Sequence, residues 1–210
     1  MNIHHARVNL DRPVVWPSVM SQPPRRPTPA EVQAAKGHTI RDVIRADLDV
    51  LFCGINPGLY TAAAGHHFAR PGNRFWPALH DAGFTRRRLY PWEQEQLLEV
   101  GCGVTNLVAR ATATAAELDD EELRAGRRRL VRKIRRFRPQ VVAIVGVGAY
   151  RVAFDRPRAT LGRQNETIAN AALWVLPNTS GLNANHQAKD FAKTFGALRD
   201  FVKAEGQKQK

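Results

Sequence analysis

The stretch LFCGINPGLYTAAAGHHFARPGNRFW, residues 51–76, decides the fold because it has the pattern of a buried strand, a rigid loop and a helix start. The apolar run VLFC is short and uncharged, which is typical of a strand covered on both faces. It leads to the polar amide of Asn56, which is followed by the conformationally restricted pair Pro57-Gly58. Residues 71–83 then favour a helix, with an apolar-periodic run that ends at a glycine.

The same alternation continues outward from this stretch. Periodicity, caps and breakers predict helices at residues 28–35, 71–83, 91–101, 118–137 and 186–204, and strands at 46–55, at 141–150 (running into a turn) and at 172–177. Strands that alternate with helices and are almost wholly apolar favour a parallel sheet with both faces covered. The sequence therefore predicts an α/β protein, a three-layer α/β/α sandwich with a central, mostly parallel sheet.

Two local signals support the predicted helix ends, and a third segment, which contains two glycines, is considered as a possible cofactor loop. Thr28 is expected to cap the first helix, with Glu31 at the capping-box position. Pro139 should stop the helix at 118–137, whose apolar residues form one stripe. The segment GVGAYR after residue 145 lacks the third glycine of a dinucleotide loop, so Gly146 and Gly148 are interpreted as packing glycines.

Length and charge limit the class of protein. The chain has 210 residues, enough for about one domain, and residues 1–29 hold six of its 13 prolines. We expect residues 1–29 to form a disordered arm and residues 30–210 a single domain. The net charge of +13 favours a polyanionic partner such as nucleic acid, although an arginine-rich composition of genomic origin is the alternative.

The positions of the basic residues indicate which of them could contact a polyanionic partner. Nine Lys and Arg residues lie within 124–138, mostly on the predicted solvated face of a helix. Better candidates for phosphate contacts lie nearer the loops: Arg74, Arg86, Arg87, Arg88 and Arg110.

Cys53 and Cys102 stand in apolar settings and are expected in the core of a protein from a reducing compartment. No signal-peptide pattern or membrane-length apolar run occurs, so a cytoplasmic protein with no membrane partner is expected.

Open parallel sheets bind ligands beyond the carboxyl ends of their strands, which directs attention to the loops there. Asn56 is either a turn residue or a rigidly held catalytic amide. His66 and His67 have poor spacing for metal ligands, so one of the pair is expected to be buried and hydrogen-bonded. Phe68 is either a core residue or a platform on which a planar base stacks. Leu182, an apolar residue within a polar loop, would suit a wedge between base steps.

These residues carry a family resemblance. GINPG, followed by GHHF and PGNRFW, resembles the first active-site motif of the mismatch-specific uracil/thymine-DNA glycosylases of the uracil-DNA glycosylase superfamily. The likeness continues through GCGVTNLVARATATAAEL and WVLPNTSGL and covers about residues 40–203. HH before Phe68, and Asn106, are closer to the thymine-DNA glycosylase branch, whereas Leu182 is closer to the bacterial mismatch-specific uracil glycosylase branch.

The resemblance implies a role for each site residue. Asn56 would orient the attacking water, while Ile55, Phe68, Asn106, Thr61 and His67 would bind the flipped base. Thr61 stands where the thymine-processing branch has a smaller residue, so a thymine methyl group would be hindered. The wedge loop would comprise Ser180, Gly181, Leu182 and Asn183, although the bacterial branch has Ser-Arg after its wedge where this chain has Asn183 and Ala184.

The implied activity is base excision repair by a monomeric, monofunctional DNA glycosylase that flips uracil, and more slowly thymine, out of double-stranded DNA with a G·U or G·T mismatch. No cofactor or metal would be required, and the enzyme would be cytoplasmic and associated with the nucleoid. Two alternatives stay open. One is another uracil-DNA glycosylase subfamily that acts on single-stranded or any uracil, and the other is a non-catalytic α/β module that binds nucleic acid.

Overall fold

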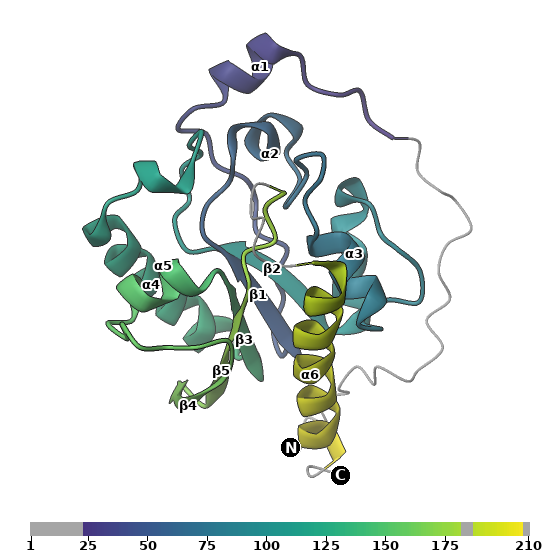
Figure 1. The fold of residues 1–210 in the computed structure, drawn as a ribbon, viewed down its shortest axis with the longest axis vertical. Coiled ribbons are helices and arrows are strands. Elements are labelled where there is room, and N and C mark those ends of the chain that lie inside the picture. Colours follow the sequence, from purple (N-terminus) through teal and green to yellow (C-terminus); the bar gives the residue numbers. More distant parts are fainter. Residues whose placement is uncertain (1–22, 182–186, 208–210) are drawn as a thin grey trace, which may run out of the picture.

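The computed structural model describes residues 23–181 and 187–207 and has one five-stranded sheet at its centre (Figure 1). The strand order is β2-β1-β3-β5-β4, with strands β1 (Val50–Gly54), β2 (Cys102–Asn106), β3 (Val141–Val145), β4 (Gly162–Ile168) and β5 (Ala171–Leu176). All neighbouring pairs are parallel except β4 with β5. The predicted α/β/α architecture with a mostly parallel sheet is confirmed.

Helices cover both faces of the sheet (Figure 1). The helices of the described chain are α1 (Pro29–Ala34), α2 (Leu59–Ala64), α3 (Phe75–Asp81), α4 (Asp120–Phe137), α5 (Val147–Ala153) and α6 (Ala188–Gln207), with 3₁₀ helices η1 (Pro91–Val100) and η2 (Ala115–Glu117). Helices α3 and α6 pack with η1 on one face, around Phe52, Phe75 and Phe195. Helices α4 and α5 pack on the other face, around Leu51 and Ile144. Alternate residues of β1 therefore enter two separate cores.

Local signals of helix ends were predicted well. The Thr28 side chain accepts a hydrogen bond from the Glu31 N–H, and the Glu31 carboxylate closes the capping box. Helix α4 ends at Phe137, and Arg138 has a left-handed backbone before Pro139. Seven of the nine basic residues at 124–138 are exposed. Cys53 and Cys102 are both buried, and burial raises the pKa of the Cys53 thiol to about 12.

Several predictions were wrong in detail. Strand β2 and helix α2 were not foreseen as elements, and residues 147–153 continue as helix α5 where a turn was expected. Strand β4 was missed because its sequence, GRQNETI, is polar, as an exposed antiparallel edge strand allows. The helix expected at 91–101 is a 3₁₀ helix. Gly146 packs against Ile55 as expected, whereas Gly148 is exposed and has open space around it.

Two sets of expectations fall partly outside the described residues. Of the proline-rich arm only residues 23–29 are described, and residues 1–22 are not. Leu182 and Asn183, expected in the wedge loop, also lie outside the described residues. Within the described part of the chain, no helix has the length and apolar character needed to cross a membrane.

Candidate active site

A cavity of about 480 Å³ opens at the carboxyl edge of the sheet, where the loops after β1, β2, β3 and β5 meet. This volume lies within the range typical of small-molecule sites. The lining is mainly amides, hydroxyls and small apolar groups from Ile55, Asn56, Gly58, Thr61, His67, Phe68, Arg70, Asn73, Asn106, Thr112, Ala113, Thr114, Ala115, Val145, Asn178, Thr179 and Ser180. None of these described lining residues is acidic, and Arg70 carries the permanent charge among them.

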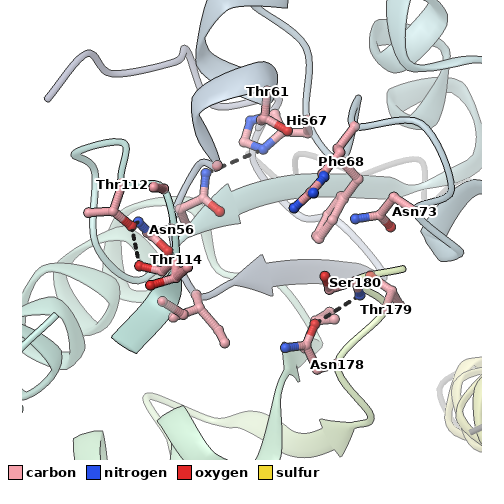
Figure 2. A pocket seen from close by; sticks show the side chains of 17 residues that line it. Asn56, Thr61, His67, Phe68, Asn73, Thr112, Thr114, Asn178, Thr179 and Ser180 are labelled. Atoms are coloured by element: carbon pink, nitrogen blue, oxygen red, sulfur yellow. Dashed lines mark hydrogen bonds between the residues drawn. The ribbon is translucent and has the colours of Figure 1, made fainter. Parts of the chain in front are cut away.

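Asn56 lies on one side of this cavity with its amide group held in one orientation (Figure 2). Its Nδ2 donates to the carbonyl oxygen of Arg110 at 3.1 Å and to Oγ1 of Thr112 at 2.7 Å. The Thr112 hydroxyl in turn donates to the carbonyl oxygen of Thr114 at 2.7 Å. Both hydrogens of the Asn56 amide are therefore used, and its Oδ1 is left as a hydrogen-bond acceptor.

Phe68 lies across the cavity from Asn56 (Figure 2). Its ring stacks on Phe75 of α3, with centroids 4.0 Å apart and planes at 19°. One face of the Phe68 ring is thus covered, which leaves the other for a planar ligand. Phe68 also has a left-handed backbone, with φ at 54°, which is uncommon for a residue other than glycine. Local strain of this kind often accompanies a functional site.

His67 and Asn106 form the back of the cavity. His67 is only 1% exposed, and Nε2 of its ring lies 3.0 Å from the carbonyl oxygen of Arg41. Its Nδ1 lies 3.5 Å from Nδ2 of Asn106. Burial lowers the pKa of His67 to about 4, so the ring is neutral at pH 7. The prediction that one histidine of the pair is buried and hydrogen-bonded is confirmed.

Thr61 and Ile55 also line the cavity, as the sequence predicted. Thr61 is buried on helix α2, and Ile55 follows the last residue of β1. The structure therefore brings all six residues expected to bind the base or to catalyse into one place: Ile55, Asn56, Thr61, His67, Phe68 and Asn106.

Residues 178–180, which follow β5, line another part of the cavity. Arg74 holds them, since Arg74 Nη2 donates to the carbonyl oxygen of Ser180 at 2.5 Å and the Arg74 N–H donates to that of Thr179. The Arg74 guanidinium also lies over the ring of Phe191, 4.7 Å from its centroid. A Cβ on Gly181 would lie 2.8 Å from the carbonyl oxygen of Gly72, so the loop after β5 is in close contact with the loop before α3.

Several of the arginines predicted to contact phosphate groups are engaged in contacts within the protein. Arg110 forms a bidentate pair with Glu122, and Arg87 forms one with Glu93. Arg74 is engaged with the 178–181 segment. Arg70, which the sequence analysis did not single out, is exposed at the cavity.

Thr112 was also missed. Its signal is weak, because it lies in the repetitive segment ARATATAAEL, where several hydroxyl residues look equivalent. Only the pairing of Gly58 with Thr112 across the loops brings this hydroxyl to Asn56. Asn73 and Asn178 also line the cavity without having been assigned there.

A comparison with known families assigns the chain to one of them. The model of the Uracil DNA glycosylase superfamily matches residues 41–201. The chain belongs to the uracil DNA glycosylase superfamily. Membership of this superfamily supports the assignment of the chain as a DNA glycosylase, a hydrolase that excises uracil in DNA repair. The match includes every residue that lines the cavity, and it leaves out α1.

A solved structure shows a similar fold. The chain is 16% identical to a candidate uracil DNA glycosylase from Methanosarcina acetivorans, solved by NMR, with a TM-score of 0.51. The similarity covers 78% of this chain and 98% of that one. At this level of identity the likeness shows the shared uracil DNA glycosylase fold alone.

Proposed function

We propose that this uracil DNA glycosylase is monofunctional and mismatch-specific: it removes uracil, and more slowly thymine, opposite guanine in double-stranded DNA. The observation that carries the proposal is the orientation of Asn56 in a cavity whose described lining residues include no carboxylate. Many glycosidases use a pair of carboxylates, one of which acts as nucleophile or base. In their absence, the chemistry must come from a positioned water and from stabilisation of the leaving group.

Asn56 is suited to position that water. An amide is too weak a base to remove a proton fully, but the Asn56 Oδ1 can accept a hydrogen bond from water and so hold it for attack on the sugar C1′. Because its Nδ2 is fixed by the Arg110 carbonyl and Thr112, the acceptor cannot rotate away. The water oxygen bonds to C1′ as the bond to uracil N1 breaks and the pyrimidine leaves as an anion. The proton that the water loses passes to the departing pyrimidine, so the products are an abasic sugar and free uracil.

The rest of the cavity suits the flipped base and its negative charge. The open face of Phe68 can stack on the pyrimidine, and the neighbouring Phe68 N–H makes no hydrogen bond within the described residues, so it can donate to a base carbonyl. The main-chain N–H of Phe68 and the lack of acidic side chains among the described lining residues favour an anionic leaving group. No lysine is among the described residues that line the cavity, which is consistent with water attack without a Schiff base.

The test is a single-turnover assay on end-labelled duplexes that carry U·G, T·G or U·A, and on single-stranded uracil. The expected order of excision is U·G fastest, then U·A and T·G. Strands should break only after alkali treatment, and borohydride should trap no enzyme–DNA adduct. Equal rates on single-stranded and mismatched uracil would favour a broader uracil-DNA glycosylase subfamily. Binding without excision of any base would make the chain a non-catalytic DNA-binding module.

A further inference from the structure

The ring of His67 has partners at both nitrogens, and these partners fix where its proton lies. The carbonyl oxygen of Arg41, 3.0 Å from Nε2, can only accept a hydrogen bond. Nε2 must therefore carry the proton. In the neutral ring Nδ1 then has a lone pair and can only accept.

This assignment fixes the amide of Asn106. The atom that faces His67 Nδ1 must be a donor, so it is Nδ2 of Asn106, 3.5 Å away. The Asn106 Oδ1 then points to the other side, over Gly54, where a Cβ would lie 2.5 Å from it and 3.3 Å from the edge of the Phe68 ring. The acceptor oxygen of Asn106 thus lies beside the surface on which the base would stack.

We propose that His67 is a positioning residue that selects uracil over cytosine by holding the Asn106 amide with its oxygen toward the base. Uracil presents an N–H donor at N3 and a carbonyl at C4, whereas cytosine presents a lone pair at N3 and an amino group at C4. An amide oxygen opposite N3 accepts from uracil and repels cytosine. A reversed amide would invert that preference.

The proposal rests on the proposed function, and it gives His67 a role other than direct contact with the base. Both ring nitrogens are already used, one by the Arg41 carbonyl and one by Asn106. The main chain of His67 is also held, because its N–H donates to Gln94 Oε1 at 2.8 Å and its carbonyl accepts from Trp76 Nε1 at 3.1 Å. The ring is therefore rigid enough to determine the orientation of its neighbour.

Two substitutions separate positioning from packing. The amide nitrogen of His67→Gln can occupy the place of Nε2 and keep the bond to the Arg41 carbonyl, but it leaves no acceptor for Asn106. The amide oxygen of His67→Asn can occupy the place of Nδ1 and keep that acceptor. The substrates are duplexes with 5-fluorouracil or 5-fluorocytosine opposite guanine, because the fluorine makes both bases better leaving groups.

We expect His67→Gln to lower the ratio of 5-fluorouracil to 5-fluorocytosine excision by about tenfold, the effect of losing one oriented hydrogen bond. His67→Asn should stay within about twofold of the wild-type ratio. If His67→Gln slows the excision of both bases equally, or if His67→Gln and His67→Asn change the excision ratio alike, His67 has only a packing role and the proposal is overturned.

A second measurement on the free protein is independent of excision. Nitrogen-15 NMR of labelled histidine at pH 7 should show His67 as the neutral tautomer protonated at Nε2. A proton at Nδ1 would overturn the proposal even in an active enzyme. If the wild type excises no uracil while His67 is protonated at Nε2, the proposed function fails and the hydrogen-bond arrangement stands, so the two failures are distinguishable.

Discussion

The two sides of the cavity are held in different ways. On one side, which we call the amide wall, side chains fix side chains: Asn56 bonds to Thr112, and Asn106 bonds to His67. On the other side, the loop wall at 178–181, contacts to the main chain prevail: Arg74 bonds to the Ser180 carbonyl, Asn178 Oδ1 accepts from the Ser180 N–H, and Gly181 packs against Gly72. The amide wall thus sets atoms in place for chemistry and base recognition, whereas the loop wall sets the course of the backbone.

Removing Asn56 should break the amide wall most severely. Asn56→Ala takes away the acceptor for water without changing the stacking surface, so we expect excision of uracil from U·G to fall by roughly a hundredfold to a thousandfold. Affinity for a uracil-containing duplex should stay close to wild type. Single-turnover rates and filter-binding titrations measure the two quantities, and near-normal excision would rule out the role assigned to Asn56.

Gly54→Ala should disturb the amide wall from strand β1, on which Gly54 lies. The new Cβ would lie 2.5 Å from Asn106 Oδ1 and 3.3 Å from the Phe68 ring, so one or both must shift into the cavity. A displacement of that size is expected to slow uracil excision by roughly tenfold to a hundredfold. Gly148→Ala is the matched control, because Gly148 is exposed and has nothing within 4 Å of its Cβ position. Equal effects of the two substitutions would show that Gly54 does not support the site.

Arg74→Ala tests the loop wall. It removes the hydrogen bond to the Ser180 carbonyl and the contact with the Phe191 ring, so we expect uracil excision to fall by about tenfold. The uracil-to-thymine ratio should not change, because the amide wall that surrounds the base is intact. Arg158→Ala, in an exposed loop between α5 and β4, is the control. A change in base preference with Arg74→Ala would mean that the two walls do not act separately.

Thr61 should influence only the base with a methyl group. Thr61 is buried at the cavity, and its branched side chain is proposed to hinder thymine, so Thr61→Ala should raise thymine excision from T·G by about fivefold. Uracil excision should stay nearly unchanged. Thr61→Val keeps the shape and should leave thymine excision at the wild-type rate. If alanine has no effect on thymine, Thr61 does not face the 5-position of the base.

The last effect concerns the pH dependence of stability, to which the amide wall contributes, and not the rate of excision. Burial lowers the pKa of folded His67 to about 4, while Asp42 opposes this shift and Lys133 and His66 add to it. Between pH 6.5 and 4 the unfolded chain binds a proton that the folded one does not, so stability falls as pH falls through this window. Urea titrations across that range should show a shallower decline for His67→Gln. Parallel curves would mean that His67 is not buried in its neutral form.

The sequence by itself determined the fold class and the position of the site. The strands around Phe52, Ile144 and Val175 are short apolar runs, and the ends of α1 and α4 carry local caps, so neighbours along the chain suffice to predict them. Asn56 could be assigned to the sheet edge for the same reason, because it follows a predicted strand directly. The family motif added the expected set of base-binding residues.

Only the tertiary structure decided how those residues are oriented. Asn56 is 56 positions from Thr112, and His67 is 39 positions from Asn106, so neither hydrogen bond leaves a periodic signal in the sequence. Strand β2 was missed because its partner β1 lies far from it in the chain, whereas the polar edge strand β4 was missed because it lacks an apolar pattern. Apolar burial follows local patterns, whereas the direction of a hydrogen bond depends on which group the fold brings opposite it.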